Sequence, residues 1–585
     1  METVVMKNGS IVQSPAWVKD LIIYEIATKG FTSPNGPESG TFNSLREKME
    51  YLRELGITCV WLTGSQWSQP DHFYGIWNQY ACIRPDMLDP SLGTRDDFKG
   101  MIDEAHRCGI RIVLDVITHG VMNESPLIRE KPHWFKGGSW GMTDYDWCGG
   151  HGDLDEWWVD TWVGLVRDFH VDGFRLDVAI GRFDLWSLIR KKALELGHEI
   201  VVFPEFAPAT AGVTDFTQDG CRLSRGGRLS DDVAGFIGDA VARRNLLNMY
   251  KVKITYADGS VAESHTGDLN ALAVAYEGEY KELKQCKESA YVEHGGILRV
   301  DNVCIDKKIS HIVVYDGERY GWELGMTGDR SLRAKGKAPT LRLNFPLRKQ
   351  DGQYLSIMLS SHDYGWEGFP AGQNPYFAQG SRFLFGYAFL FAPAIPIFMS
   401  GEEFNADFVP LPKLTPKLYG GLDHGKGTWL YGSWIQWDQL ASMEKQEMLT
   451  DVKKMIGIRR RAASLIRPFR MGEEAMTLLH VDCESDRPIP VPYMYYDKNR
   501  MLIVAGNADE YAGVEVKFKM PVPVVENLPS GSLFKVSDLW NGKEAGMATA
   551  AEFEDMTWTI SKDRSAGGGL LVLELKSEGM PACRR

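Results

Sequence analysis

Short apolar runs alternate with helix-like segments along most of the chain. The clearest runs are LIIYEI (21–26), CVWLTG (59–64), RIVLDVI (111–117), GFRLDV (173–178) and IVVFPE (200–205), with two more at 356–360 and 395–399. Helical patterns lie between them, for example over 42–55, 94–108 and 154–169. This alternation predicts a parallel sheet with helices outside. About eight strands over roughly 250 residues fit a closed (β/α)8 TIM barrel better than an open sheet.

Two stretches interrupt the predicted barrel. Residues 120–155 form a short, Trp-rich excursion after the third strand. Residues 250–346 hold runs of alternating polarity such as KVKITYADGSV, whose ADGS is a hairpin signal, and this predicts an inserted β-rich module between strands 5/6 and 7. We expect one further barrel strand near 212–218. The barrel domain is predicted over 1–470, and segments such as MLIVAG and LLVLEL predict a C-terminal antiparallel β-sandwich over 471–585.

The fourth predicted strand carries charge where a buried parallel strand should be apolar. In GFRLD (173–177), alternation places Phe174 and Leu176 on one face and Arg175 and Asp177 on the other. Parallel strands buried on both faces normally read as continuous apolar runs. Breaks of this kind are expected where a functional site is built.

Other predicted strands also end in polar side chains. The third strand contributes Asp115 and His119, the fifth ends in Glu205, and the seventh is followed by His362 and Asp363. The carboxyl ends of the strands of a (β/α)8 barrel meet at one rim, where active sites lie. A lone histidine or ion pair is usually structural. Burying carboxylates from four strand ends at one rim costs free energy, so packing alone does not explain this arrangement.

Two carboxyl groups on opposite sides of a glycosidic bond can cleave that bond. We expect Arg175 to keep its neighbour Asp177 ionised, because a nearby cation lowers the pKa of a carboxyl group. Glu205 follows Phe203 and Pro204, and apolar surroundings would raise its pKa and keep it protonated. The residues therefore favour Asp177 as nucleophile and Glu205 as acid.

The ordered motifs DVITH (115–119), GFRLD (173–177), a strand that ends in Glu205, and SHD (361–363) resemble the α-amylase superfamily, glycoside hydrolase family thirteen. The resemblance implies a retaining double displacement through a covalent glycosyl-enzyme. It also implies the role of each residue: Asp177 as nucleophile, Glu205 as acid/base, Asp363 as transition-state stabiliser, Arg175 as the residue that orients Asp177, Asp115 as its support, His119 and His362 as hydroxyl-binding residues, and Tyr74 as the aromatic platform.

Two departures from the family pattern narrow the prediction. Thr118 stands where many α-amylases have a calcium-binding Asn, so we expect no such calcium and no cofactor. Asp177 is followed by VAI rather than by a segment with the Lys-His pair of typical endo-acting α-amylases. A Val in the first of these positions resembles members that act on α-1,4 bonds in oligosaccharides. The expected substrate is therefore a small α-glucoside or malto-oligosaccharide.

Composition agrees with a small neutral ligand. The 585 residues carry a formal net charge of −13, which argues against nucleic acid or an anionic membrane as a partner. Nine scattered cysteines indicate reduced thiols, and the N-terminal METVVMKNGSIVQ has no apolar core of a signal peptide. We therefore expect a cytoplasmic protein; the sequence leaves a homo-oligomer open.

Three functions compete. The first is an α-glucosidase-like glycoside hydrolase. The second is a transglycosylase or a sucrose/maltose isomerase of the same superfamily, in which a sugar hydroxyl replaces water. The third is a non-enzymatic sugar-binding protein on the same barrel, which predicts a missing carboxylate where none is missing. A dehydrogenase is disfavoured because no GxGxxG follows a strand.

Overall fold

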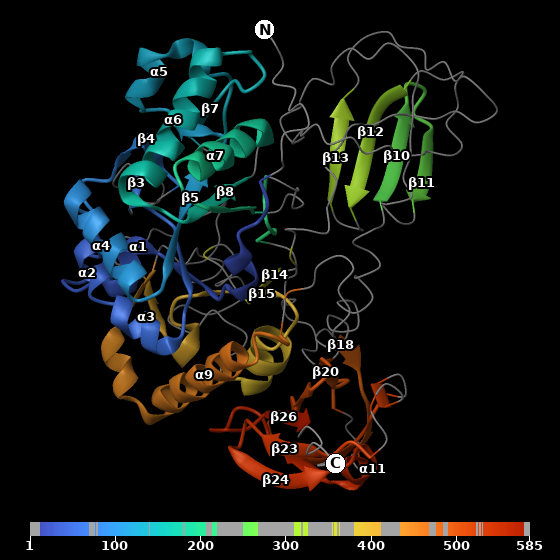
Figure 1. The fold of residues 1–585 in the computed structure, drawn as a ribbon. Helices are drawn as coiled ribbons and strands as arrows, with labels where there is room; N and C mark the ends of the chain where they lie inside the picture. The colour runs from blue at the N-terminus through green and yellow to red at the C-terminus, as the bar shows by residue number, and fades with distance from the viewer. Residues whose placement is uncertain are drawn as a thin grey trace, which may run out of the picture.

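The barrel is the first and largest part of the molecule (Figure 1). The computed structural model describes residues 12–68, 77, 80–139, 141–178, 182–205, 213–218, 250–266, 309–316, 320–325, 354, 356–359, 362, 380–410, 433–466, 468, 476–483, 489–521, 524–525, 528 and 531–577. Seven parallel strands form one sheet in the order β14-β15-β1-β2-β5-β8-β9. They are β1 (Ile23–Ile26), β2 (Cys59–Leu62), β5 (Arg111–Ile117), β8 (Gly173–Asp177), β9 (Val201–Pro204), β14 (Ser356–Met358) and β15 (Ile395–Met399). This arrangement confirms the predicted (β/α)8 class.

Among the described residues, 213–218 form no regular strand, which corrects the expectation of a strand near 212–218. Residues 213–218 instead run as irregular backbone between β9 and β14. The backbone N–H of Asp215 donates to Val202 at 2.8 Å, and Tyr354 N–H donates to Asp215 at 2.9 Å. The Asp215 carboxylate also accepts the Val202 N–H at 2.9 Å. Side-chain bonds therefore replace part of the ladder at this position.

Helices surround the sheet and bury one apolar face each. They are α1 (Thr28–Thr32), α2 (Phe42–Arg46), α3 (Met49–Leu55), α4 (Arg95–Arg107), α6 (Gly152–Phe169), α7 (Phe183–Glu195), a π-helical segment (Leu384–Leu390) and α9 (Met443–Arg461), with 3₁₀ turns at Ala16–Asp20, Glu402–Phe404 and Trp437–Ala441. A single helix was expected over 42–55, but the chain makes two, separated by a turn at 47–48. The Thr41–Ser44 capping box stabilises the start of the first helix.

Short excursions leave the carboxyl ends of β2 and β5. The first is the pair β3 (Gln66–Ser68) and β4 (Cys82–Leu88). The second contains β6 (Gly120–Met122), α5 (Pro126–Glu130), a 3₁₀ turn (Pro132–Trp134) and β7 (Met142–Asp144). It falls within the excursion predicted over 120–155.

The described part of the insertion is a four-stranded antiparallel sheet in the order β11-β10-β12-β13. Its strands are β10 (Tyr250–Tyr256), β11 (Val261–Thr266), β12 (Ile309–Asp316) and β13 (Tyr320–Gly325). Figure 1 shows this sheet to one side of the barrel. The domain limits 250–346 and 471–585 stay predictions.

Two antiparallel sheets make up the C-terminal part, in the orders β18-β20-β21-β26-β23-β24 and β19-β22-β25. Their inner faces share one apolar cluster, as in a β-sandwich. The elements are β18 (Met476–Leu478), β19 (His480–Cys483), β20 (Tyr493–Tyr496), β21 (Arg500–Gly506), β22 (Val514–Lys519), β23 (Phe534–Asp538), β24 (Lys543–Ala548), α11 (Ala550–Asp555), β25 (Trp558–Ile560) and β26 (Leu570–Ser577). One further small pair, β16 (Phe408–Pro410) and β17 (Ser433–Ile435), precedes α9.

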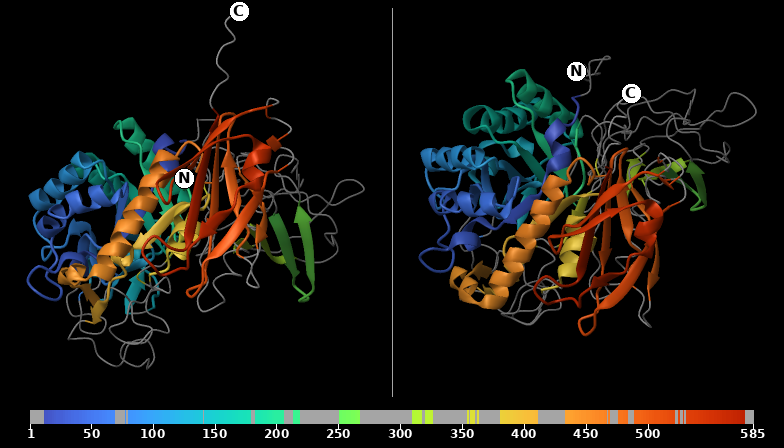
Figure 2. Two further views of the ribbon diagram at one scale, coloured as in Figure 1. Left: turned by 90° about the horizontal axis from the view of Figure 1, so that it is seen from below. Right: turned by 60° about the horizontal axis from the view of Figure 1, so that its bottom comes forward.

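Helix α9 joins the barrel to these sheets (Figure 2). Its Arg459 is buried and donates to the backbone carbonyls of Leu390, Ala392 and Ala394, the last at 2.7 Å. Burial lowers the pKa of Arg459 to about 10. These carbonyls lie at the end of the π-helical segment and in the turn before β15, where the backbone offers them no helical hydrogen-bond donor. The Arg459 guanidinium supplies the donors instead.

The barrel interior changes from apolar to polar along its axis. Its amino-terminal end is filled by side chains that include Ile23, Cys59, Val113 and Val201. Side chains two residues apart on a strand point to the same face. Glu25, Trp61 and Asp115 follow Ile23, Cys59 and Val113 by two residues, so they also point into the barrel interior. The polar residues therefore gather at the carboxyl end of the barrel.

Candidate active site

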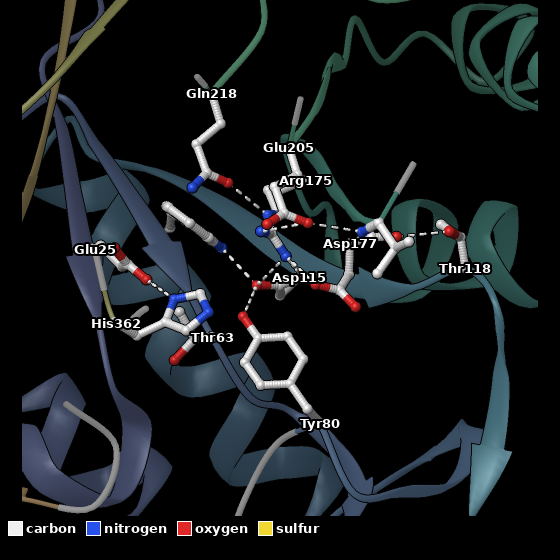
Figure 3. Close-up of polar contacts among 12 residues, drawn as sticks. Glu25, Thr63, Tyr80, Asp115, Thr118, Arg175, Asp177, Glu205, Gln218 and His362 are labelled. Carbon is white, nitrogen blue, oxygen red and sulfur yellow. Dashed lines mark hydrogen bonds and ion pairs between the residues drawn. The ribbon is translucent and has the colours of Figure 1, made fainter. Parts of the chain in front are cut away.

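Arg175 is the centre of the polar cluster (Figure 3). It lies on β8, is fully buried, and pairs in register with Asp115 of β5 and Phe203 of β9. Its Nη1 donates to Asp177 Oδ1 at 2.7 Å and to Asp115 Oδ1 at 3.0 Å. Its Nη2 lies 3.4 Å from Glu205 Oε2. One guanidinium thus contacts three carboxylates from the ends of three adjacent strands.

Two further contacts fix the plane of the guanidinium. Its Nε donates to Gln218 Oε1 at 2.8 Å, and its Cζ lies 5.0 Å from the centroid of the Trp61 ring. Gln218 comes from the irregular sixth segment and is fully buried. The surrounding acidic groups outweigh burial and raise the pKa of Arg175 above its ordinary value. Arg175 is therefore a permanent, rigid cation.

Two donors besides Arg175 hold the Asp115 carboxylate. Its Oδ2 accepts hydrogen bonds from Trp61 Nε1 at 3.1 Å and from the Tyr80 hydroxyl at 2.9 Å. These bonds occupy both oxygens of Asp115, because Oδ1 already accepts from Arg175. This geometry supports a structural role for Asp115 beside Arg175.

Asp177 is the last residue of β8 and is 8% exposed. Burial raises its pKa to about 7, Arg175 opposes the shift, and Glu205 and Asp115 add to it. The expectation that Arg175 keeps Asp177 ionised is therefore wrong in its net result. A single cation shared among three buried carboxylates does not offset the loss of solvation.

Glu205 lies directly after β9, and its backbone N–H donates to Leu176 at 3.0 Å. Its Oε2 accepts the backbone N–H of Val178 at 2.9 Å. The apolar surroundings that the sequence predicted for this carboxylate are replaced by this N–H and by Arg175. Asp177 and Glu205 thus both contact the Arg175 guanidinium. Glu205 also accepts the N–H of Val178, whereas Asp177 lies near His119.

Val178 adopts an unusual backbone conformation. Its φ is +55°, a left-handed value that β-branched residues rarely adopt. The conformation turns the Val178 N–H toward Glu205 immediately after Asp177. Backbone strain of this kind persists where the surrounding structure enforces it, and it gathers at functional sites.

The two histidines predicted for the site lie on either side of it. His119 Nε2 is 3.8 Å from Asp177 Oδ2, and its Nδ1 is 3.4 Å from Asp144 Oδ1. His362 bonds to Glu25 through Nδ1, and its ring stacks on Tyr80 with centroids 4.9 Å apart. Both histidines are nearly buried, with exposed fractions of 6% and 1%.

The structure brings together six of the eight predicted site residues: Asp115, His119, Arg175, Asp177, Glu205 and His362. Tyr74 and Asp363 lie outside the described residues. The sequence patterns did not point to Glu25, Trp61, Tyr80, Asp144 or Gln218. Glu25 carried a usable signal, since it is a charge inside the apolar run LIIYEI, as Arg175 and Asp177 are inside theirs.

Thr118, the residue expected not to bind calcium, makes hydrogen bonds within the protein. Thr118 Oγ1 donates to the backbone carbonyl of Asp177 at 2.6 Å, and Trp147 Nε1 donates to the Thr118 carbonyl at 2.9 Å. Within the described part of the chain, no group of three His, Cys, Asp or Glu side chains is arranged to hold a metal. The absence of a calcium site stays a prediction.

Comparison with known proteins shows what part of the chain is similar to. Residues 25–133 match the catalytic-domain model of alpha-amylase. The chain is 33% identical over 118 residues to a trehalose synthase/amylase of Mycobacterium tuberculosis, which covers 20% of this chain and 18% of that protein. It is 34% identical over 109 residues to an oligo-1,6-glucosidase of Heyndrickxia coagulans, 18% of this chain and 19% of that one. The matched segment is thus about a fifth of these relatives.

Solved structures match the fold over nearly the whole chain. A noncanonic maltogenic alpha-amylase of Thermotoga neapolitana gives a TM-score of 0.54 at 15% identity, over 95% of this chain and 99% of that one. An alpha-amylase of Lactobacillus plantarum gives 0.52 at 14% identity, over 96% and 100%. These structures share the fold of the chain, and its residues 25–133 are similar to the alpha-amylase catalytic domain.

No helix among the described residues is long and apolar enough to cross a membrane.

Proposed function

We propose that this protein is a retaining glycoside hydrolase that cleaves α-glucosidic bonds in small oligosaccharides, with α-1,4 bonds as the expected linkage. One observation carries the proposal: Asp177 and Glu205 contact the same buried guanidinium from adjacent strand ends. This contact keeps the two carboxyl groups close together. The narrower of the two carboxyl separations found in glycosidases belongs to retaining enzymes.

In the first step Asp177 attacks the anomeric carbon while Glu205 protonates the departing glycosidic oxygen. The Asp177–sugar bond forms as the sugar–oxygen bond breaks, and the product leaves as an alcohol. In the second step Glu205, now a carboxylate, takes a proton from water, and the resulting hydroxide displaces Asp177. His119, His362 and Asp363 are proposed to bind the hydroxyl groups of the sugar.

The relatives named trehalose synthase support a second candidate, in which a sugar hydroxyl replaces water in the second step. Both candidates need Asp177 and Glu205 in the same roles. They differ in products: hydrolysis gives shorter sugars, and transfer gives rearranged or longer ones.

The test incubates the purified protein with α-1,4-, α-1,6- and α-1,1-linked glucosides and with sucrose, and follows the anomer of the first product by NMR. We expect an α-anomer. Glu205→Gln should lower the rate by about 10²- to 10⁴-fold, the usual contribution of a general acid. Glu403→Gln is the matched control, because Glu403 is also a fully buried glutamate beyond a barrel strand but bonds to Tyr24 and Tyr51. Initial release of a β-anomer would refute the retaining mechanism.

A further inference from the structure

Thr118 bonds to the backbone of the proposed nucleophile (Figure 3). It lies directly after β5, is buried, and donates its hydroxyl to the carbonyl oxygen of Asp177 at 2.6 Å. The parallel register of β5 and β8 pairs Ile117 with Asp177. The side chain of the next residue, Thr118, therefore joins the two strands at the point where β8 ends.

The direction of the Asp177 carbonyl follows from the pleat of β8. The carbonyl of Leu176 points toward β9, where it accepts the N–H of Glu205 at 3.0 Å. Successive carbonyl groups along a strand point to opposite sides, so the carbonyl of Asp177 points toward β5. The next residue, Val178, leaves the extended conformation with a φ of +55°. Thr118 thus holds the last carbonyl of the strand before the chain turns.

One peptide group connects the two proposed catalytic carboxylates. The carbonyl of Asp177 and the N–H of Val178 belong to the same planar unit. Its oxygen accepts from Thr118, and its N–H donates to Glu205 Oε2 at 2.9 Å. Because the unit is planar, the bond from Thr118 also fixes the direction in which the N–H points. The strained turn at Val178 needs such contacts in order to persist.

The excursion after β5 holds Thr118 in turn. Trp147 Nε1 donates to the carbonyl of Thr118 at 2.9 Å, and the N–H of Tyr145 donates to the carbonyl of His119 at 2.8 Å. The Trp147 ring packs against Tyr145 and Trp158, with centroids 5.0 Å apart in both pairs. Thr118 therefore lies between the nucleophile and a buried cluster of aromatic rings.

We propose that Thr118 is a positioning residue whose hydroxyl fixes the peptide group between Asp177 and Val178, and that Trp147 holds Thr118 for this purpose. Thr118 acts through the backbone of Asp177 rather than on substrate. Because Arg175 holds the Asp177 carboxylate at 2.7 Å, the nucleophile is fixed at both its side chain and its backbone. This inference rests on the function proposed above and adds two residues to the same site.

Two substitutions separate the hydroxyl from the shape of the side chain. Thr118→Val keeps the branched shape and removes the hydroxyl, whereas Thr118→Ser keeps the hydroxyl. Misplacing a reacting group by about 1 Å can cost about 100-fold, so we expect Thr118→Val to lower kcat by about 10- to 100-fold with KM nearly unchanged. Thr118→Ser should keep most of the wild-type kcat.

Thr28→Val is the matched control, because Thr28 is also buried and donates to a backbone carbonyl, that of Gly64, at 2.6 Å. It should leave kcat close to the wild-type value. Equal losses of kcat in Thr118→Val and Thr118→Ser, or in Thr118→Val and Thr28→Val, would overturn the proposal.

The role of Trp147 is tested by Trp147→Phe, which keeps an aromatic ring and removes the N–H. This change should also lower kcat, but in the Thr118→Val background it should cause no further loss. An equal loss in both backgrounds would show that Trp147 acts independently of Thr118.

Hydrogen exchange tests the same bond without substrate. The full-length protein is labelled in deuterated water, and peptides that contain Val178 are analysed by mass spectrometry. The Val178 N–H should exchange faster in Thr118→Val than in the wild type, and at the wild-type rate in Thr118→Ser and Thr28→Val. An unchanged rate in Thr118→Val would overturn the proposal. A wild type that turns over no glucoside would refute the proposed function, while the exchange rates would still decide whether Thr118 fixes this peptide group.

Discussion

Replacing the proposed nucleophile should stabilise the fold, by an amount that grows with pH. Burial raises the pKa of Asp177 from 3.8 to about 7, so the folded protein holds a proton there that the unfolded chain releases at lower pH. A folded-state pKa above the unfolded value means that stability falls as pH rises from the unfolded pKa to the folded one. Asparagine has the same shape and no charge to desolvate. Asp177→Asn should therefore escape this loss.

The difference of about three pH units, at about 1.4 kcal/mol each, corresponds to about 4 kcal/mol above pH 7. Asp177→Asn removes the desolvation of this carboxylate and its repulsion by Glu205 and Asp115 together, so the whole shift contributes to this figure. The assay is thermal unfolding of wild type and Asp177→Asn from pH 4.5 to 8, with Asp160→Asn as control because the Asp160 side chain is 65% exposed. We expect the gap in Tm to widen up to about pH 7 and then level off. A gap that is constant or narrows with pH would refute the reasoning.

Three further predictions follow from particular residues. Val178→Gly should raise stability by about 1 kcal/mol, because left-handed backbone costs a non-glycine residue about 1–3 kcal/mol and glycine loses about 0.5–1 kcal/mol through entropy. The same change should lower kcat/KM, because the N–H held against Glu205 is loosened; unchanged activity would contradict this. Chelator and added calcium should leave the Tm unchanged, since Thr118 is bonded to Asp177, and a calcium-dependent rise would show a site we do not expect. Arg459→Met should destabilise the protein by several kcal/mol, because each buried carbonyl left without a donor costs about 1–3 kcal/mol, and a Tm near the wild-type value would show that other donors replace it.

The sequence located the barrel strands because each is short, apolar and buried on both faces. It misplaced the sixth because residues 213–218 depend on distant partners rather than on a local pattern. Asp215 binds the Val202 N–H and pairs with Arg190 of α7, and no alternation within VTDFTQ reveals this. The conformation of residues 213–218 therefore depends on long-range side-chain contacts that the local sequence pattern does not reveal.

The charged residues on β8 and the end of β9 were predictable as a site because they interrupt apolar strands. Their protonation was not, since the number of carboxylates around one cation depends on packing. Glu25 was missed because its partner His362 is 337 positions away, and only the fold brings the two together. Glu25 nevertheless follows the same rule as Arg175 and Asp177, because a charge inside an apolar barrel strand indicates a polar partner in the barrel interior.

The most direct test of the central claim is to trap the covalent intermediate. The protein would be incubated with a fluorinated α-glucosyl fluoride, which slows hydrolysis of the glycosyl-enzyme, and then digested and analysed by mass spectrometry. We predict one added glucosyl group on the peptide that contains Asp177, and none in Asp177→Asn. A label on another carboxylate would contradict the assignment of the nucleophile, and turnover of the reagent without a trapped ester would contradict the double displacement.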